Sequence, residues 1–246
     1  MQICKNSDEL RAAQRLRYEV FVAEKGASGP MVDTTHRLER DAFDPYCTHL
    51  ILRDLARPAD DQVVGTYRLM TGSQARHGIG FYSANEYDLS PILKTSDRVV
   101  ELGRSCLHPA YRGGEGMMVL WRALAEFIKA EDIEIMFGVA SFAGTDPSQY
   151  YDAFSILAER HLAPPEMRVA AKPPGAISFE KNSSRGFDRK QAVQQMPALL
   201  KAYLRLGAWV GDGAFVDHDF NCIDVCIVLH QRAIDGLRRQ IYGRRV

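Results

Sequence analysis

The stretch VVELGRSCLHPAYRGGEGMMVLWRAL, residues 99–124, decides the fold. Its first part is apolar and predicts a strand that ends before Pro109, and the apolar spacing after Gly116 predicts a helix. The turn between them offers backbone N–H groups and the positive end of a helix dipole, which together bind phosphate. The candidate residues of this turn are Arg112, Gly113, Gly114 and Gly116. Because a Gly-Gly pair before a helix is often only a turn, the turn alone leaves phosphate binding open.

Helices and strands are also predicted on both sides of this stretch. We expect helices over 8–24, 115–130, 148–161 and 197–206, and strands over 48–54, 63–70, 97–108, 133–140 and 219–230. Residues 72–93 are interpreted as a long, partly ordered connection. Residues 163–190, rich in Pro, Gly, Ser and Lys/Arg, are interpreted as a linker or a mobile flap.

The order of these elements predicts an α/β fold with a central mixed sheet flanked by helices. We expect a single domain over residues 1–246 with its core at about 1–162. The C-terminal third is expected to add a helix, a strand and a basic tail over 191–246.

Composition excludes several classes of protein. The chain has 246 residues with 31 Lys+Arg and 31 Asp+Glu, so the formal charge is zero, and 46% of its residues are hydrophobic. Such a composition excludes a disordered chain and a bulk polyanion binder, and no nucleic-acid partner is expected. No stretch reaches the ~18 consecutive apolar residues of a membrane-spanning helix.

Cysteine and histidine patterns predict neither a disulfide framework nor a metal site. The five cysteines form no C-x-x-C pair, and the seven histidines show no H-x-x-x-H or H-E-x-x-H spacing. Cys222 and Cys226 lie on one face of an expected strand, with Asp224 between them, and are interpreted as reduced core thiols. We therefore expect no metal and a cytoplasmic location.

The strand, turn and helix of residues 99–124 resemble the acyl-donor-binding motif of the GCN5-related N-acetyltransferase (GNAT) fold, R/Q-x-x-G-x-G/A. Arg112 fills the first place, but Glu115 stands where the first glycine would be. A carboxylate there would repel a pyrophosphate. This departure favours the thioester of a carrier protein, whose phosphopantetheine arm has a single phosphodiester, over acetyl-CoA.

Four further segments resemble two related groups of GNAT-fold enzymes, the acyl-homoserine-lactone synthases and the ornithine N-acyltransferases of ornithine-lipid synthesis. They are LRYEVFVAEKG at 16–26, D-x-F-D at 41–44, VVGTYRLM at 63–70 and ELGRSC at 101–106. The block at 196–229, MPALLKAYLRLGAWVGDGAFVDHDFNCIDVCIVL, is similar to the second group and hardly to the first. The resemblance covers residues 10–232 and implies a GNAT-like fold with a splayed sheet.

The implied reaction moves a 3-hydroxyacyl group from acyl carrier protein to the α-amine of L-ornithine, giving lyso-ornithine lipid. The co-substrate is an acyl thioester on a phosphopantetheine arm, and no other cofactor is expected. The lipid product implies peripheral contact with the inner face of the membrane, for which the basic tail is a candidate. Alternatives are an N-acyltransferase for lysine, glycine or tyrosine, a lactone synthase, and a non-enzymatic scaffold that binds carrier protein or lipid.

The chemistry of amine attack on a thioester assigns roles along strand 97–108. Glu101 is the candidate general base, because a carboxylate within reach of the amine takes its proton. Backbone N–H groups near Ser105, Cys106 and Leu107 are candidate oxyanion donors and contacts of the acyl donor. The alternative is that Glu101 only forms an ion pair with Arg104 or Arg68. Residues 101 and 104 lie on opposite faces of a regular strand, and a bulge would change that.

Charged residues of the shared segments are the candidate ornithine contacts. Arginine suits the substrate carboxylate through bidentate hydrogen bonds, and acidic side chains suit the distal ammonium. The candidates are Arg17, Arg68 and Arg104 for the carboxylate and Asp41 and Asp44 for the ammonium. The alternative is a buried network that holds the N-terminal segment in place.

Overall fold

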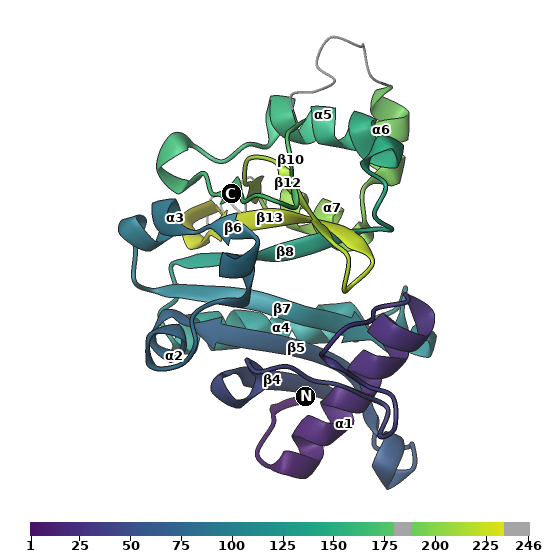
Figure 1. The fold of residues 1–246 in the computed structure, drawn as a ribbon. Helices are drawn as coiled ribbons and strands as arrows, with labels where there is room; N and C mark the ends of the chain where they lie inside the picture. Colours follow the sequence, from purple (N-terminus) through teal and green to yellow (C-terminus); the bar gives the residue numbers. More distant parts are fainter. Residues whose placement is uncertain (180–187, 234–246) are drawn as a thin grey trace, which may run out of the picture. The chain divides into compact units, whose positions relative to one another are not determined.

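Strand β7, Val99–Leu107, contains one of the points at which the chain passes from one to the other of two compact units in the computed structural model (Figure 1). The structure describes residues 1–179 and 188–233. The first unit comprises residues 1–80, 102–133 and 219–221, and the second comprises 81–101, 134–218 and the chain from 222 onward. Because the units interleave in sequence, their limits do not follow the expected division at residue 162. The single domain stays a prediction.

The first unit is a sheet with helices packed against it. Its strand order is β1-β4-β5-β7, where β1 is Gln2–Ile3, β4 is Thr48–Arg53 and β5 is Val63–Thr71. A hairpin of β2, Val32–Asp33, and β3, Leu38–Glu39, lies outside this sheet. The helices are α1, Ser7–Arg17, which continues as a π-helix over Tyr18–Glu24, then α2, Gly72–His77, and α4, Gly116–Ala130.

Helices α1 and α4 cover opposite faces of this sheet. The α1 side contains a cluster of Ala13, Leu16, Val20, Ile51, Val63 and Cys106. On the α4 side, a Cβ added to Gly65 would lie 2.7 Å from Leu107 and 3.2 Å from Leu120 and Leu52. Neighbouring residues Ile51 and Leu52 thus face different helices, as the alternation of a strand requires. Leu120, Leu124 and Ile128 are the buried residues of α4, at the four-residue spacing of one helical face.

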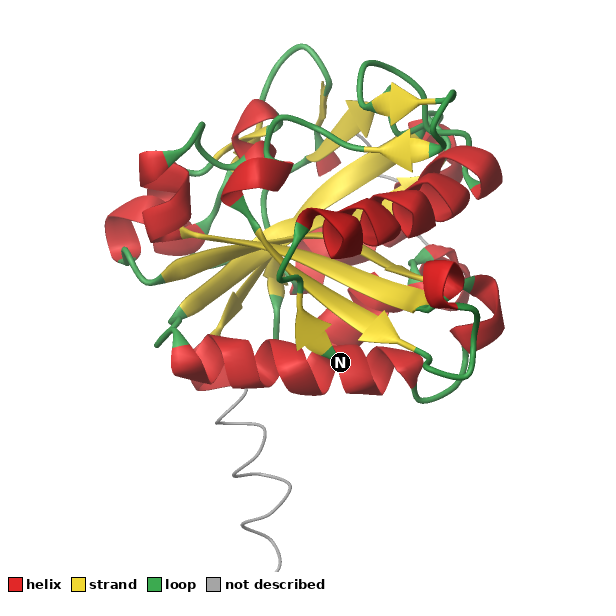
Figure 2. Cartoon of the chain, turned by 90° about the horizontal axis from the view of Figure 1, so that it is seen from below, coloured by secondary structure: helices red, strands yellow, loops and turns green. Residues whose placement is uncertain are grey.

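The second unit contains a mixed sheet. Val99–Glu101 of β7 pairs in parallel with the start of β8, Ile135–Ala143, and β8 pairs antiparallel with β13, Cys222–His230, along its whole length. Outward from β13 lie β12, Ala214–Asp217, and β10, Ala176–Ile177, while β11, Trp209–Val210, also pairs with β13. A separate pair joins β6, Tyr87–Asp88, to β9, Ala170–Ala171. Figure 2 distinguishes strands in yellow from helices in red.

The described residues of this unit form four α-helices: α3, Ser90–Thr95; α5, Tyr151–Arg160; α6, Arg189–Gln195; and α7, Ala198–Arg205. Helix α5 packs against α6, and α7 contacts β13. In the part of the chain that the structure describes, no helix combines the length and apolar character needed to cross a bilayer.

Most sequence-predicted elements are confirmed, the prediction for residues 72–93 is wrong, and the linker or flap over 163–190 stays a prediction. Residues 72–93 form α2, a 3-10 turn at Tyr82–Asn85, β6 and the start of α3 rather than a partly ordered connection. Thr71 begins this order with a capping box, since its side chain accepts from Gln74 N while Gln74 bonds back to Thr71 N. Residues 163–179 are likewise structured, with β9 and β10, and α6, β11 and β12 were not predicted. Residues 180–187 of the proposed flap and the basic tail, 234–246, lie outside the described residues.

Candidate functional site

A network of three arginines and three carboxylates is buried in the first unit. Arg17, from α1, is 0% exposed; its Nη1 and Nη2 donate to Asp44 at 2.8 and 3.0 Å, and its Nε donates to Glu39. Arg68, from β5, donates through Nη1 to Asp41 at 2.6 Å and to Asp44 at 2.8 Å. Each carboxylate is thus bound by an arginine, which offsets the cost of removing these charges from water.

Arg104, from β7, completes the network. Its Nε donates to Glu39 at 3.2 Å and its Nη2 to Asp41 at 2.9 Å, and its guanidinium lies 4.3 Å from the ring centroid of Phe220. Three positive and three negative side chains therefore balance in charge. The structure brings together Arg17, Asp41, Asp44, Arg68 and Arg104, all of which the sequence analysis named.

Glu39 is the member that the sequence analysis missed. It is 0% exposed and connects Arg17 to Arg104. Glu39 and Asp41 are two positions apart, so they share one side of an extended chain. That spacing, next to the D-x-F-D segment, was the signal that could have identified Glu39.

The burial of these side chains favours the structural role that the sequence left open. The side chains of Arg17, Asp44 and Arg68 are 0%, 3% and 4% exposed, whereas those of Arg104 and Asp41 are 8% and 13% exposed. Direct contact of ornithine with any of the five stays a prediction, and the more exposed pair is better placed for it.

The pKa values of Asp44, Asp41 and Arg17 depend on the partners of these side chains within the network. Burial alone would raise the pKa of Asp44, but Arg17 and Arg68 outweigh it and hold this pKa well below its usual range. The pKa of Asp41 is lowered in the same way, with Arg68 and Arg104 outweighing burial. Burial alone would lower the pKa of Arg17, and Glu39 and Asp44 reverse this and raise it.

These directions predict loss of stability in acid. A carboxylate whose folded-state pKa is depressed contributes stability above its unfolded pKa of about 3.9, and this contribution is lost as pH falls through the folded pKa. We expect the free energy of unfolding to fall steeply below about pH 4. Denaturant melts between pH 6 and 2 check this, with Asp44→Asn as the comparison. If the free energy of unfolding of Asp44→Asn falls with decreasing pH as steeply as that of the unmodified chain, the proposed role of Asp44 is contradicted.

The backbone of β7 departs from a regular strand at Arg104, whose φ of +50° is left-handed. Non-glycine residues rarely adopt this conformation, and it persists where the surroundings hold the side chain in place. Glu39, Asp41 and Phe220 supply those contacts. The strict alternation that would set residues 101 and 104 on opposite faces is therefore interrupted.

Glu101 lies in the second unit and is 6% exposed. Its Oε1 accepts from Ser83 N at 2.6 Å and Ser83 Oγ at 2.5 Å, and its Oε2 accepts from Tyr82 N at 2.9 Å. A carboxylate offers about four lone-pair sites, so three donors fix its orientation and leave acceptor capacity on Oε2. These partners belong to the Tyr82–Asn85 turn, and none of the three is an arginine.

Residues 105–107 end β7. Ser105 Oγ is buried and has no hydrogen-bond partner among the described residues. Cys106 packs in the α1-side cluster, and burial raises the pKa of its thiol to about 12, so the thiol stays protonated. The roles of Ser105, Cys106 and Leu107 through their backbone N–H groups stay predictions.

The turn between β7 and α4 follows the predicted strand and precedes the predicted helix, while its binding of the acyl donor stays a prediction. Gly113 has a φ of +73°, which requires glycine, and no heavy atom of the described chain lies within 4 Å of a Cβ added at Gly113 or Gly114. Arg112 donates through Nη1 and Nη2 to the two carboxylate oxygens of Glu24 at 2.6 Å each, and through Nε to Leu107 O at 3.1 Å. Glu115 precedes α4 without capping it through its side chain.

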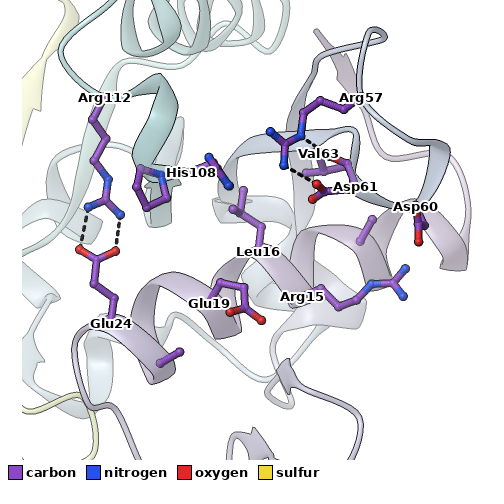
Figure 3. Close-up of a pocket in the computed structure, with 13 residues that line it drawn as sticks. Arg15, Leu16, Glu19, Glu24, Arg57, Asp60, Asp61, Val63, His108 and Arg112 are labelled. Atoms are coloured by element: carbon purple, nitrogen blue, oxygen red, sulfur yellow. Dashed lines mark hydrogen bonds and ion pairs between the residues drawn. The ribbon is translucent and has the colours of Figure 1, made fainter.

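A pocket of about 690 Å³ in the first unit borders this turn (Figure 3). Its walls come from α1, the π-helix, the segment before β5 and the turn after β7. Charged lining residues include Arg15, Glu19, Glu24, Arg57, Asp61 and Arg112. Figure 3 shows the Arg112–Glu24 pair on one side and the Arg57–Asp61 pair on the other.

In the second unit, Asp217, Cys222 and Asp224 approach one another, with one potential ligand atom from each within 4.8 Å of the others. Burial, together with Asp224 and Asp217, raises the pKa of the Cys222 thiol well above its usual range. All five cysteines are unbonded thiols. The cluster alone does not define a metal site, and the absence of a metal stays a prediction.

Comparisons with known proteins identify the family and the fold of the chain. A family model described as an acetyltransferase (GNAT) domain matches residues 16–122. The chain is 45% identical to the L-ornithine N(alpha)-acyltransferase of Rhodobacter capsulatus, over 100% of this chain and 95% of that protein. It is 36% identical to the L-ornithine N(alpha)-acyltransferase of Brucella abortus, over 99% of this chain and 88% of that protein.

Among solved structures, the fold resembles that of BjaI, a CoA-dependent acyl-homoserine lactone synthase, with a TM-score of 0.52 and 14% identity over 95% of this chain and 82% of that one. This likeness confirms the GNAT acyltransferase fold. Identity to curated relatives over the whole chain goes further: the protein belongs to the L-ornithine N(alpha)-acyltransferase family.

Proposed function

We propose that the protein transfers a 3-hydroxyacyl group from acyl carrier protein to the α-amine of L-ornithine, giving lyso-ornithine lipid. The 45% identity to the Rhodobacter capsulatus enzyme over the full chain carries this proposal. In the reaction the amine nitrogen attacks the thioester carbonyl, a C–N bond forms and the C–S bond breaks. The amine loses a proton, and the departing thiolate of the phosphopantetheine arm gains one.

Glu101 is the general base of this proposal. Its carboxylate is oriented by Tyr82 N and by the N and Oγ of Ser83, so little reorganisation precedes proton transfer. Oε2, which accepts only one of these three bonds, is the oxygen that takes the amine proton, directly or through one water.

In this proposal, ornithine is bound by the two more exposed side chains of the charge network. Arg104 suits the substrate carboxylate and Asp41 suits the distal ammonium, because their side chains are the more accessible ones at 8% and 13%. Arg17, Glu39, Asp44 and Arg68 then act as positioning residues that hold both groups in place. The left-handed backbone of Arg104 supports a site whose geometry is maintained by its surroundings.

The donor is assigned as a carrier-protein thioester on electrostatic grounds. Two carboxylates, Glu24 and Glu115, flank the turn that would receive the donor's phosphate. A single phosphodiester is repelled less by them than the pyrophosphate of coenzyme A. The thioester is already activated toward an amine, so the proposed reaction needs no further cofactor.

The test incubates purified protein with 3-hydroxyacyl carrier protein and, separately, ornithine or each of the twenty amino acids. Mass spectrometry of the lipid extract should show an N-acyl product with ornithine only. A product with another amino acid in place of ornithine would contradict the proposed acceptor. A parallel series with 3-hydroxyacyl-CoA should be slower, and an equal rate would overturn the donor assignment.

A further inference from the structure

Arg112 meets a partner that no sequence motif indicated. Its two terminal nitrogens donate to the two oxygens of Glu24 at 2.6 Å each, although the residues are 88 positions apart. The Nε of Arg112 is also used, by Leu107 O at 3.1 Å. The guanidinium that the donor motif assigns to phosphate is thus held by a carboxylate at the end of the π-helix.

The geometry of this pair resembles a bound phosphate. The planar fork of arginine binds two oxygens of a carboxylate or two oxygens of a phosphate in the same bidentate manner. No described residue beyond their chain neighbours closes the space next to Gly113 and Gly114, so the adjoining turn is open to an approaching ligand. Both partners are 39% exposed on the wall of the pocket in Figure 3, so water screens the pair and a bound anion could replace Glu24.

We propose that Glu24 is a specificity-determining placeholder: it occupies the Arg112 fork in the free enzyme and is displaced by the phosphate of the acyl donor. This rests on the proposed function, in which the donor carries a phosphopantetheine arm. Displacement leaves a carboxylate next to the phosphate. A glutamate carboxylate, with an ordinary pKa of about 4.3, is ionised at neutral pH, so the displaced Glu24 carries a charge that opposes a weakly docked donor. A donor that makes further contacts, such as those of a carrier protein, gains enough binding energy to outweigh the repulsion between Glu24 and its phosphate.

The decisive variant is Glu24→Gln, which keeps the size of the side chain and removes its charge. We expect KM for the acyl donor to fall about two- to fivefold, with kcat at saturating donor unchanged, because only donor binding competes with Glu24. Arg112→Ala should raise the donor KM, and Glu24→Gln should have no further effect in that background.

The matched control is Glu19→Gln. Glu19 lines the same pocket and forms a bidentate pair with Arg37, and the two side chains are 46% and 58% exposed, respectively. The donor KM of this variant should equal that of the unmodified protein.

Direct binding separates this inference from the proposed function. Fluorescence anisotropy with labelled holo-carrier protein and with a fluorescent CoA measures affinity without turnover, and the two arms distinguish the sources of phosphate. Tighter binding of either probe to Glu24→Gln supports the placeholder even if ornithine proves not to be the acceptor. Unchanged or weaker binding of both probes overturns it, because Glu24 would then either be neutral or position Arg112 for the donor.

Discussion

Replacing Glu101 with Gln is expected to lower kcat for acyl transfer by about 10²- to 10⁴-fold, the range contributed by a positioned general base. The amide keeps the shape of the side chain but takes no proton from the ammonium of ornithine. Steady-state kinetics at saturating donor measure the loss. Raising the pH above about 8 should restore part of the rate, because free amine then becomes abundant in solution.

Ser83→Ala provides the control for this variant. It removes the hydrogen bond from Ser83 Oγ to Glu101 while keeping the carboxylate and both backbone donors, Ser83 N and Tyr82 N. We expect a small decrease in kcat without the rescue at high pH. If Glu101→Gln turns over at the rate of the unmodified protein, Glu101 is not the base.

Replacing Arg17 with Met is expected to destabilise the first unit by about 3–5 kcal/mol, because breaking a buried ion pair leaves its partners charged and unsolvated. The methionine fills much of the same space, so lost packing contributes little. Glu39 and the Asp44 carboxylate would each lose a donor that is 0% exposed. Since total stabilities are about 5–15 kcal/mol, the variant should unfold at a much lower denaturant concentration.

The matched control is Arg37→Met, which breaks a bidentate pair with Glu19 at the surface. Exposed pairs contribute little to stability, so its unfolding curve should nearly overlay that of the unmodified protein. The double variant Arg17→Met, Glu39→Gln should recover part of the loss, because Arg68 and Arg104 then face Asp41 and Asp44, two buried charges of each sign. A curve for Arg17→Met that matches Arg37→Met would show that the network does not stabilise the fold.

Secondary structure was predictable where its signal is local. The apolar run of β7 and the four-residue spacing of Leu120, Leu124 and Ile128 in α4 both appear within a single short window of sequence. The region of residues 72–93 was misinterpreted because its order depends on a cap at Thr71 and on Tyr82 and Ser83 bonding to Glu101. The bonds to Glu101 join residues 19 and 18 positions apart, which periodicity does not report.

For the candidate site too, the sequence identified residues but not their roles. Resemblance identified Arg17, Asp41, Asp44, Arg68 and Arg104, but it left open whether they bind ornithine or one another. Burial favours the second role for Arg17, Asp44 and Arg68. No pattern in the sequence distinguishes an arginine that is 0% exposed from one at a pocket wall, because exposure depends on which distant segments pack against it.

The sequence by itself determined the strand–turn–helix of residues 99–130 and the family of the chain, because each follows from neighbouring residues or from motif order. Only the tertiary structure decided that Glu39 completes the charge network and that Glu24 binds the Arg112 fork. Attraction between charges acts through space, so the partner of a charged side chain is set by the folded path of the chain rather than by its position in the sequence.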